Sequence, residues 1–383
     1  DAPSTPPRPL YRTRAERWEE LLERREFHPF VRLGLDLDET EKLVERALAA
    51  LDSAGLVLLD DERVLTSPLG APLVADVAAR AVSAAWVRPG DQVGVVACDV
   101  LEGYRADRVV ESLKAAGELD VRRIELTPFG DLEGRKLHPV RVAHAVEEVY
   151  EQSGDALEMW SEQIGDDLDR LFLPPCMGRT TRTAGEIVDA LAERCGCEVA
   201  EMPGTRHSIH GWRLDRSLRA DRPATHSARA ESIEGEDDTW KVTLPETELE
   251  ADAVVLATGR WIGRGLPGSA PMREPLTDLD LWLDGAGLPH PTETWGPDLL
   301  REQPWDDHAL FRVGVAIGEG CRPLRRRGDP AHDTLFACGR MLSGYNPMWD
   351  GSTVGVDLVT GTSAAIAVLE SLGIDAHSQG EAA

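Results

Sequence analysis

The stretch LFACGRMLSGYNPMWDGSTVGVDLVTGTSAA, residues 335–365, decides how the rest of the chain is interpreted. Its apolar start, residues 335–338, predicts a short buried strand that Gly339 ends. A loop rich in Gly, Asn, Pro, Asp and Ser follows, and residues 354–369 predict a helix of small side chains. A strand, a glycine-rich loop and a helix in this order present backbone N–H groups to a phosphate or a polar cofactor ring. We therefore expect this stretch to form the floor of a cofactor site.

A second apolar strand, residues 253–259, lies upstream and ends in Ala-Thr-Gly. Small residues there let the backbone pass close to an adenine or a pyrophosphate, and Gly259 lets the chain turn away. A predicted β-hairpin over residues 227–244 precedes it. This layout is typical of flavoproteins with two dinucleotide-binding folds, although an ordinary buried strand with a glycine stop is the alternative.

The segment Gly351–Gly355 brings free N–H groups and two hydroxyls to the start of the predicted helix. Such a helix N-terminus suits the pyrimidine carbonyls of a flavin, or the charge that develops at its N1 on reduction. A glycine-rich capping loop without a ligand, with Asp350 as the helix cap, is the alternative. The residues predicted to contact the cofactor, FAD or FMN, are Thr258, Gly259, Gly339, Arg340, Gly344, Asp350, Gly351, Ser352, Thr353, Val354 and Gly355.

The middle of the chain predicts a second α/β region. Residues 92–98, 106–116 and 121–126 form a strand, a helix and a strand, which is typical of a parallel βαβ unit. Later strands over 171–173 and 198–202 flank another helix, so the loops gather at the carboxyl ends of the strands, where ligands bind in open sheets. Closer to the N-terminus we expect helices over 14–26 and 39–53, a hairpin of residues 56–59 with 63–66, and an Ala-rich helix over 75–85.

The fold class that follows is α/β. It consists of a discontinuous Rossmann-like domain of the FAD/NAD(P)-binding type, without its N-terminal βαβ unit, and an inserted second α/β cap domain. The expected division is 1–72 as a remnant of the cofactor domain, 73–215 as the cap or substrate domain, 216–276 as the cofactor domain with hairpin and Ala-Thr-Gly strand, 277–330 as a loop-rich cap segment, and 331–383 as the C-terminal part of the cofactor domain.

Composition excludes some classes of function. The net charge is −27, and an acidic surface opposes non-specific nucleic-acid binding. No apolar run in the sequence is long enough to span a membrane, and the first residues lack the apolar core of a signal peptide. The six cysteines show no zinc-ligand spacing, so we expect structural thiols in a reducing cytoplasm and no metal. A redox or metal role for the close pair Cys195 and Cys197 is the alternative.

Candidate substrate residues are loop arginines and a histidine, since guanidinium forks suit a small phosphorylated or carboxylated substrate. They are Arg213, Arg273, Arg322 and His207. The alternative is solvated surface, because 37 of the 41 basic residues are arginine. No residue is assigned as the proton-abstracting base. The G-x-G-x-x-G fingerprint of dinucleotide-binding flavoproteins does not occur.

Several blocks, taken together in order and spacing, give the chain a family resemblance. They are His28-Pro29-Phe30, residues 64–70, 94–96, 173–178, 208–214, Leu256-Ala257-Thr258-Gly259, Arg273-Glu274-Pro275, 311–315, Arg322-Pro323, and 335–339 continuing through 344–347 to Gly351. The chain resembles the B-type subunit of anaerobic glycerol-3-phosphate dehydrogenase, a flavoprotein family of the class with two dinucleotide-binding domains.

The resemblance implies a flavin-bearing subunit that oxidises glycerol 3-phosphate to dihydroxyacetone phosphate and passes electrons toward quinone. It implies a catalytic A-type flavoprotein partner and an iron–sulfur subunit that provides the membrane link, and hence a location at the inner face of the cell membrane. This chain departs from the family pattern at the absent fingerprint and at Gly351-Ser352-Thr353, where the family has three glycines. Two alternatives stay open: a fumarate-reductase-like flavin oxidoreductase acting on another small acid, and a flavin-free assembly subunit.

Overall fold

The chain folds into two compact units, each of which contains a pair of parallel strands. The first comprises Asp1–Arg14 and Leu48–Ala224, and the second Ala15–Ala47 and Thr225–Ala383. The α/β class is therefore confirmed, while the predicted division into cofactor and cap domains stays a prediction. The computed structural model describes residues 12–60, 64–127, 129, 136–204, 208–220, 226–236, 239–261, 265–266, 273–288, 299–303 and 306–375.

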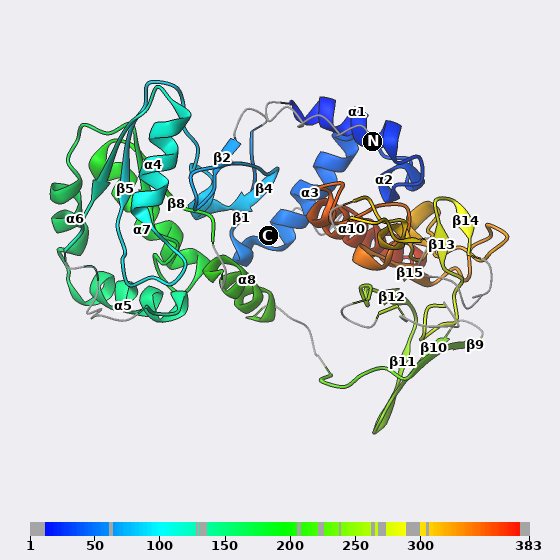
Figure 1. The fold of residues 1–383 in the computed structure, drawn as a ribbon. Coiled ribbons are helices and arrows are strands. Elements are labelled where there is room, and N and C mark those ends of the chain that lie inside the picture. Colours follow the sequence, from blue (N-terminus) through cyan, green and yellow to red (C-terminus); the bar gives the residue numbers. More distant parts are fainter. Residues whose placement is uncertain are drawn as a thin grey trace. The chain divides into compact units, whose positions relative to one another are not determined.

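A four-stranded parallel sheet forms the centre of unit 1, in the order β6-β5-β7-β8 (Figure 1). Its strands are β5 (Gln92–Val96), β6 (Asp120–Ile124), β7 (Arg170–Leu173) and β8 (Glu198–Glu201). Of these strands, β5 comes first in the sequence. β6 pairs with one edge of β5, and β7, followed by β8, lies on its other side. The predicted parallel βαβ unit is confirmed, and β5 and β7 flank the point where the strand order reverses.

Helices cover this sheet because parallel strands need crossover connections. Helix α4 packs on β5 and β6, α7 packs on β8, and α6 contacts α7. Local signals fix α7: the Thr180 hydroxyl accepts a hydrogen bond from the Thr183 N–H at its start, and Gly196 ends it in the left-handed conformation. The helices are α4 (Ala106–Ala116), α5 (Pro139–Gln152), α6 (Ala156–Ile164), α7 (Thr181–Cys195) and α8 (Ile209–Ala220).

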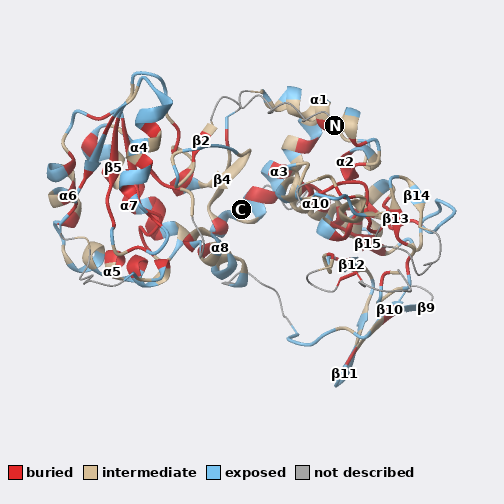
Figure 2. Cartoon of the chain, in the orientation of Figure 1, coloured by how far each residue is buried: buried red, intermediate tan, exposed pale blue. Residues whose placement is uncertain are grey.

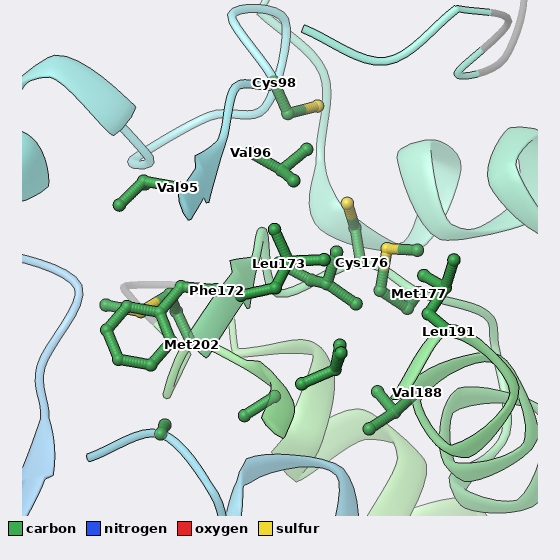
Figure 3. Packing of buried hydrophobic residues seen from close by; sticks show 14 of the residues in the cluster. Val95, Val96, Cys98, Phe172, Leu173, Cys176, Met177, Val188, Leu191 and Met202 are labelled. Atoms are coloured by element: carbon green, nitrogen blue, oxygen red, sulfur yellow. The ribbon is translucent and has the colours of Figure 1, made fainter. Parts of the chain in front are cut away.

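The core of unit 1 lies on both faces of this sheet, and every residue of β7 is buried (Figure 2). Figure 3 shows Phe172 and Leu173 of β7 among side chains from β5 and α7. Gly94 in β5 has a packing reason, since a Cβ there would lie 2.6 Å from atoms of Ile124 and Leu168. A continuous apolar run is what a strand buried on both faces requires.

Two expectations for the first part of unit 1 are wrong. β1 (Leu56–Leu58) pairs with β4 (Val77–Ala79), and β2 (Val64–Thr66) pairs with β3 (Pro72–Val74), so the predicted hairpin between residues 56–59 and 63–66 does not form. The predicted Ala-rich helix is β4 followed by a 3-10 turn, η2 (Arg80–Val82). The alanines of this segment favour a helix, but pairing with β1 outweighs that preference. Tertiary contacts often override intrinsic propensity in this way. Another 3-10 turn, η1 (Asp52–Ala54), precedes β1.

Unit 2 begins with helices that pack on its C-terminal half. They are α1 (Arg14–Arg24, starting one residue before the unit), α2 (Pro29–Arg32) and α3 (Leu37–Ala50, ending in unit 1). A capping box starts α3, because Asp36 accepts a hydrogen bond from the Glu39 N–H while Glu39 accepts one from the Asp36 N–H. The first and third helices confirm the two helices expected near the N-terminus.

Two small sheets organise the rest of unit 2. The predicted hairpin is confirmed as β9 (Ser232–Glu236) with β10 (Thr239–Leu244), and β11 (Thr247–Ala251) adds a third antiparallel strand. β12 (Val254–Leu256) pairs in parallel with β15 (Leu335–Ala337). Smaller elements are β13 (Trp282–Leu283), β14 (Ala286–Gly287), and the 3-10 turns η3 (Ala309–Arg312), η4 (Glu319–Cys321) and η5 (Gly339–Met341).

Helix α10 (Thr353–Ser371) follows η5 and its loop, and packs on η5, η4 and β15. By length and composition it is long and apolar enough to cross a membrane, so the expectation that no apolar run reaches this length is wrong. A core helix meets the same criteria, and Val356, Val359, Thr360 and Ala364 are buried against unit 2. The finding therefore does not place α10 in a membrane.

Candidate functional site

The two segments singled out in the sequence leave the same edge of a sheet. Val254 pairs with Leu335 and Leu256 with Ala337, in parallel, so both strands end at the same level. The Cys338 N–H continues the ladder with a 2.9 Å hydrogen bond to the Leu256 carbonyl. We call the group that follows the α10 site: residues 258–260, 339–345 and 350–355. It lies at carboxyl ends of parallel strands, where ligands of α/β proteins commonly bind.

Glycines at this site have conformational and steric reasons. Gly259 and Gly339 turn away from the two strand ends with φ of +74° and +73°, a region that side chains rarely adopt. Gly344 has φ +85°, and a Cβ there would lie 1.9 Å from the Phe27 carbonyl oxygen. Close backbone packing therefore holds the loop before α10 against the segment between α1 and α2.

The start of α10 is held from the side by His28. The Phe30 N–H donates to His28 Nδ1 at 3.2 Å, so the neutral ring carries its proton on Nε2 and donates to Ser352 Oγ at 3.1 Å. Burial, with Arg25 and Arg24 nearby, lowers the pKa of His28 to about 3. Ser352 consequently does not cap the helix, and the N–H groups of the first turn have no intrahelical partner.

Asp350 does not cap α10 either, and the capping role considered for it is wrong. Its buried carboxylate accepts from the Asn346 N–H at 2.6 Å, from Arg25 Nε at 3.0 Å and from Arg24 at 3.2 Å. Asp307 completes this network, since it accepts from Arg25 and from the Asn346 side chain. Burial would raise the pKa of Asp307, but these donors lower it. The loop before α10 is thus fixed by internal ion pairs.

Arg260 is a buried cation without a carboxylate partner. Its guanidinium donates to the carbonyls of Phe311, Leu342 and Tyr345, and no described carboxylate lies within ion-pair distance of it. Burial lowers its pKa to about 10, so it stays charged at neutral pH. A buried charge is costly unless an opposite charge compensates it.

Tyr345 stands beside this cation with an unused hydroxyl. The Arg260 guanidinium carbon lies 4.7 Å from the Tyr345 ring centroid, and the ring also meets His28 edge-on at 5.6 Å. Tyr345 is fully buried, and neither its Oη nor Arg260 Nε has a hydrogen-bond partner among the described residues. Buried polar atoms are usually paired, so an acceptor at this point would satisfy both residues. A bound group with acceptor oxygens and negative charge fits these residues, as a flavin with its phosphate does.

The remaining predicted cofactor residues lie around this point with varied environments. Thr258 Oγ1 approaches Met341 Sδ at 3.8 Å, and the Gly339 N–H donates to Thr360. Arg340 is exposed and pairs with Asp357, Thr353 donates to the Pro347 carbonyl, and Val354 is 52% exposed. The structure brings the predicted cofactor residues together, and their role toward a cofactor stays a prediction.

The predicted substrate residues are not brought together. Arg213 is buried in unit 1, and His207 lies outside the described residues. In unit 2, Arg273 clamps its own loop by binding Asp278 and Asp280, and Arg322 donates to the Asp333 carbonyl and covers the Phe336 ring. Internal contacts explain these three arginines, and their contact with a substrate stays a prediction.

Unit 1 has a comparable location at the carboxyl ends of β7 and β8, and internal carboxylates fill it. Glu147 of α5 accepts hydrogen bonds from the Arg179 N–H, the Arg179 side chain and the Thr183 hydroxyl. Its charge therefore occupies the N-terminus of α7, where an anionic ligand would bind. We call the ionic residues of this location the edge cluster: Glu147, Arg179, Glu201, His210 and Arg213.

The pair of Glu201 and Arg213 completes the edge cluster. Arg213 donates to both Glu201 oxygens at 2.6 and 3.0 Å and to the Gly178 carbonyl, while Glu201 also accepts from the Met177 N–H. Burial acts to raise the pKa of Glu201, but Arg213 and His210 outweigh it and lower the pKa. Cys98 and Cys176 lie just beyond the ends of β5 and β7 (Figure 3) and are buried. The arginine and glutamate charges at this edge of unit 1 are paired, while His210 Nδ1 has no hydrogen-bond partner among the described residues and lies 3.7 Å from Glu201.

Among the residues described, no three His, Cys, Asp or Glu side chains gather as metal ligands. Sequence reasoning missed Arg260, Tyr345 and the role of His28. A signal existed for two of them, because Arg260 directly follows the Ala-Thr-Gly strand and His28 belongs to a block that carries the family resemblance. Tyr345 also lies in such a block, but nothing in its spacing indicates a buried hydroxyl.

Comparison with known proteins gives named relatives of the chain. A Halobacterium salinarum protein, named as a probable anaerobic glycerol-3-phosphate dehydrogenase B-type subunit, is 28% identical over 299 residues, which cover 73% of this chain and 67% of the relative. The resemblance seen in the sequence is confirmed. A Yersinia pestis protein, named as the same type of subunit, is 23% identical over 368 residues, 91% of this chain and 82% of its own. One from Aliivibrio fischeri is 26% identical over 225 residues, 53% of this chain and 47% of its own. No family model matches the chain.

Proposed function

We propose that this chain is the B-type subunit of a glycerol-3-phosphate dehydrogenase and that it binds FAD or FMN at the α10 site. The names of its relatives support the enzyme. The cofactor is supported by the buried Arg260, which makes no ion pair with a described carboxylate, beside the Tyr345 hydroxyl, which has no hydrogen-bond partner among the described residues. The flavin would accept the two electrons removed from glycerol 3-phosphate, which becomes dihydroxyacetone phosphate.

This chain's own residues would supply electrostatics and orientation. Arg260 would place a fixed positive charge in a site of low dielectric, where it stabilises negative charge that grows during reduction. The first-turn N–H groups of α10 would act in the same direction. Tyr345 Oη would donate a hydrogen bond to an acceptor of the bound group, since burial raises its pKa to about 12 and keeps it protonated.

The proposal includes partners and location. A catalytic A-type flavoprotein and an iron–sulfur subunit would carry electrons toward quinone, and the complex would lie at the cytoplasmic face of the cell membrane. The relatives are named as one subunit of an enzyme, which supports an assembly of several chains. The acidity of the chain supports a partner other than nucleic acid.

A visible absorption spectrum of the purified protein tests the cofactor. We expect the bands of an oxidised flavin, bleached by dithionite, in the full-length protein or after incubation with FAD or FMN. A protein that neither contains nor takes up flavin would contradict the cofactor proposal and favour the flavin-free assembly subunit.

An activity assay tests the substrate. With an artificial acceptor, and with the catalytic A-type partner present or absent, we expect oxidation of glycerol 3-phosphate in the complex. Turnover of another small acid, such as reduction of fumarate, with no activity on glycerol 3-phosphate would instead favour the fumarate-reductase-like alternative.

A further inference from the structure

Unit 2 contains a cavity of about 600 Å³ that is separate from the α10 site. Three segments line it: the hairpin of β9 and β10, the loop around Arg273–Asp280, and the loop that precedes β15. Its size is in the range of pockets that hold small metabolites.

The floor of the cavity is apolar. Ile233, Trp240, Leu279 and Leu335 come from different segments and are all buried. The Trp240 indole is fixed, because its N–H donates to Thr334 Oγ1 at 2.9 Å and its ring meets His332 edge-on at 4.7 Å. A rigid apolar floor gains free energy by covering a carbon skeleton or a ring.

The rim of the cavity is cationic. Arg273 pairs with both Asp278 and Asp280, at 2.6 and 3.4 Å, so this group of three carries a net charge of −1. The guanidinium groups of Arg325–Arg327 make no ion pair with a described carboxylate, although the Arg326 backbone N–H donates to Asp280 at 3.2 Å. Among these side chains only that of Arg325 makes a hydrogen bond with a described residue, to the Ala331 carbonyl.

One carboxylate on the rim opposes these arginines. The Asp329 side chain makes no hydrogen bond or ion pair with the described part of the chain. The described lining residues include four arginines and three aspartates, so their formal charges sum to +1. Within a chain of net charge −27, such a local excess of positive charge is unexpected for a solvated surface.

We propose that this cavity binds a small organic dianion, namely a phosphomonoester whose carbon part carries a ring. Guanidinium groups bind phosphate oxygens in pairs, and Arg326 and Arg327 have no competing partner in the described part of the chain. The apolar floor would take the ring. The inference does not depend on flavin binding, because no residue of the α10 site lines the cavity.

Calorimetric titration of the full chain tests this proposal, with phenyl phosphate and inorganic phosphate as probes. We expect phenyl phosphate to bind at least about tenfold more tightly than phosphate, because only it covers the floor. The double variant Arg326→Glu/Arg327→Glu should weaken phenyl phosphate by about tenfold or more, since it replaces the cationic rim with repulsion.

A matched control is Arg105→Glu/Arg108→Glu, which reverses two exposed arginines of unit 1 and makes the same change in net charge. We expect it to bind phenyl phosphate like the original chain. No binding of phenyl phosphate, or equal losses in the two double variants, would overturn the site. Equal affinity for phosphate and phenyl phosphate would overturn the role of the apolar floor and with it the ligand class.

Discussion

The edge cluster of unit 1 and the α10 site of unit 2 both lie at carboxyl ends of parallel strands, but they treat charge in opposite ways. In unit 1, Glu147 occupies the N-terminus of α7, and Glu201 pairs with Arg213. In unit 2, Arg260 makes no ion pair with a described carboxylate, and the Tyr345 hydroxyl has no hydrogen-bond partner among the described residues. A location whose charges are compensated internally has little left to bind an anion, whereas a buried cation without a described counter-charge favours one. The comparison shows that fold position alone does not identify a site.

The largest expected effect is on the edge cluster. Arg213→Met should lower the free energy of unfolding by about 3–5 kcal/mol, because it leaves Glu201 buried without its cation. Urea denaturation followed by circular dichroism measures this. Arg219→Met is the control on the same helix: its pair with Asp215 is exposed to solvent and should contribute almost nothing to stability. Similar losses in both variants would show that the edge cluster is not a tightly paired interior.

The next effect concerns the close packing of the α10 site. Gly344→Ala should cost about 3 kcal/mol or more, because its Cβ would meet the Phe27 carbonyl and its φ is +85°. Gly328→Ala is a matched control with φ +89° and open space, and strain alone should cost about 1 kcal/mol. Thermal or urea unfolding gives the difference. Equal costs would mean that the loop before α10 is not packed as described.

Arg260 gives the sharpest test of an unpaired site. If the α10 site binds flavin, Arg260→Met should weaken the binding by about 1.5–3 kcal/mol, or roughly 10- to 150-fold, through loss of a charged contact. Equilibrium titration with FAD and FMN measures it, and Arg229→Met, an exposed residue of unit 2, should bind flavin unchanged. Unchanged flavin affinity in Arg260→Met would show that Arg260 does not contribute to flavin binding, even if the protein binds flavin.

The smallest effect is a pH dependence from His28. Its pKa is about 3 in the folded protein and about 6.5 when unfolded, so the unfolded state binds the extra proton between these values. Stability should therefore fall as pH decreases below about 6.5, by roughly 1 kcal/mol per pH unit from this residue. His28→Asn keeps an acceptor for the Phe30 N–H and should have a shallower slope in urea unfolding between pH 7 and 5. An unchanged slope would show that His28 is not buried and neutral beside Ser352.

Much of the fold could be predicted from local patterns. Apolar runs indicated β5, β7, β12 and β15, and helical periodicity with capping residues indicated α1, α3, α4 and α10. Pairing was harder, because a short strand such as β1 can hydrogen-bond to several partners. It pairs with β4 instead of β2. The Ala-rich sequence of β4 favours a helix by propensity, so a helix was predicted where this strand forms.

The sequence by itself indicated that two segments of the α10 site belong together, because Gly259 and Gly339 end two apolar strands in a layout typical of a cofactor site. Only the tertiary structure decided which charges are compensated. Arg213 and Arg260 both follow a strand in the sequence, and nothing nearby in the chain distinguishes them. Arg213 forms an ion pair with Glu201, whereas Arg260 donates hydrogen bonds only to carbonyl groups among the described residues. Charge compensation acts over a few ångströms between residues far apart in the chain, so no local pattern could specify it.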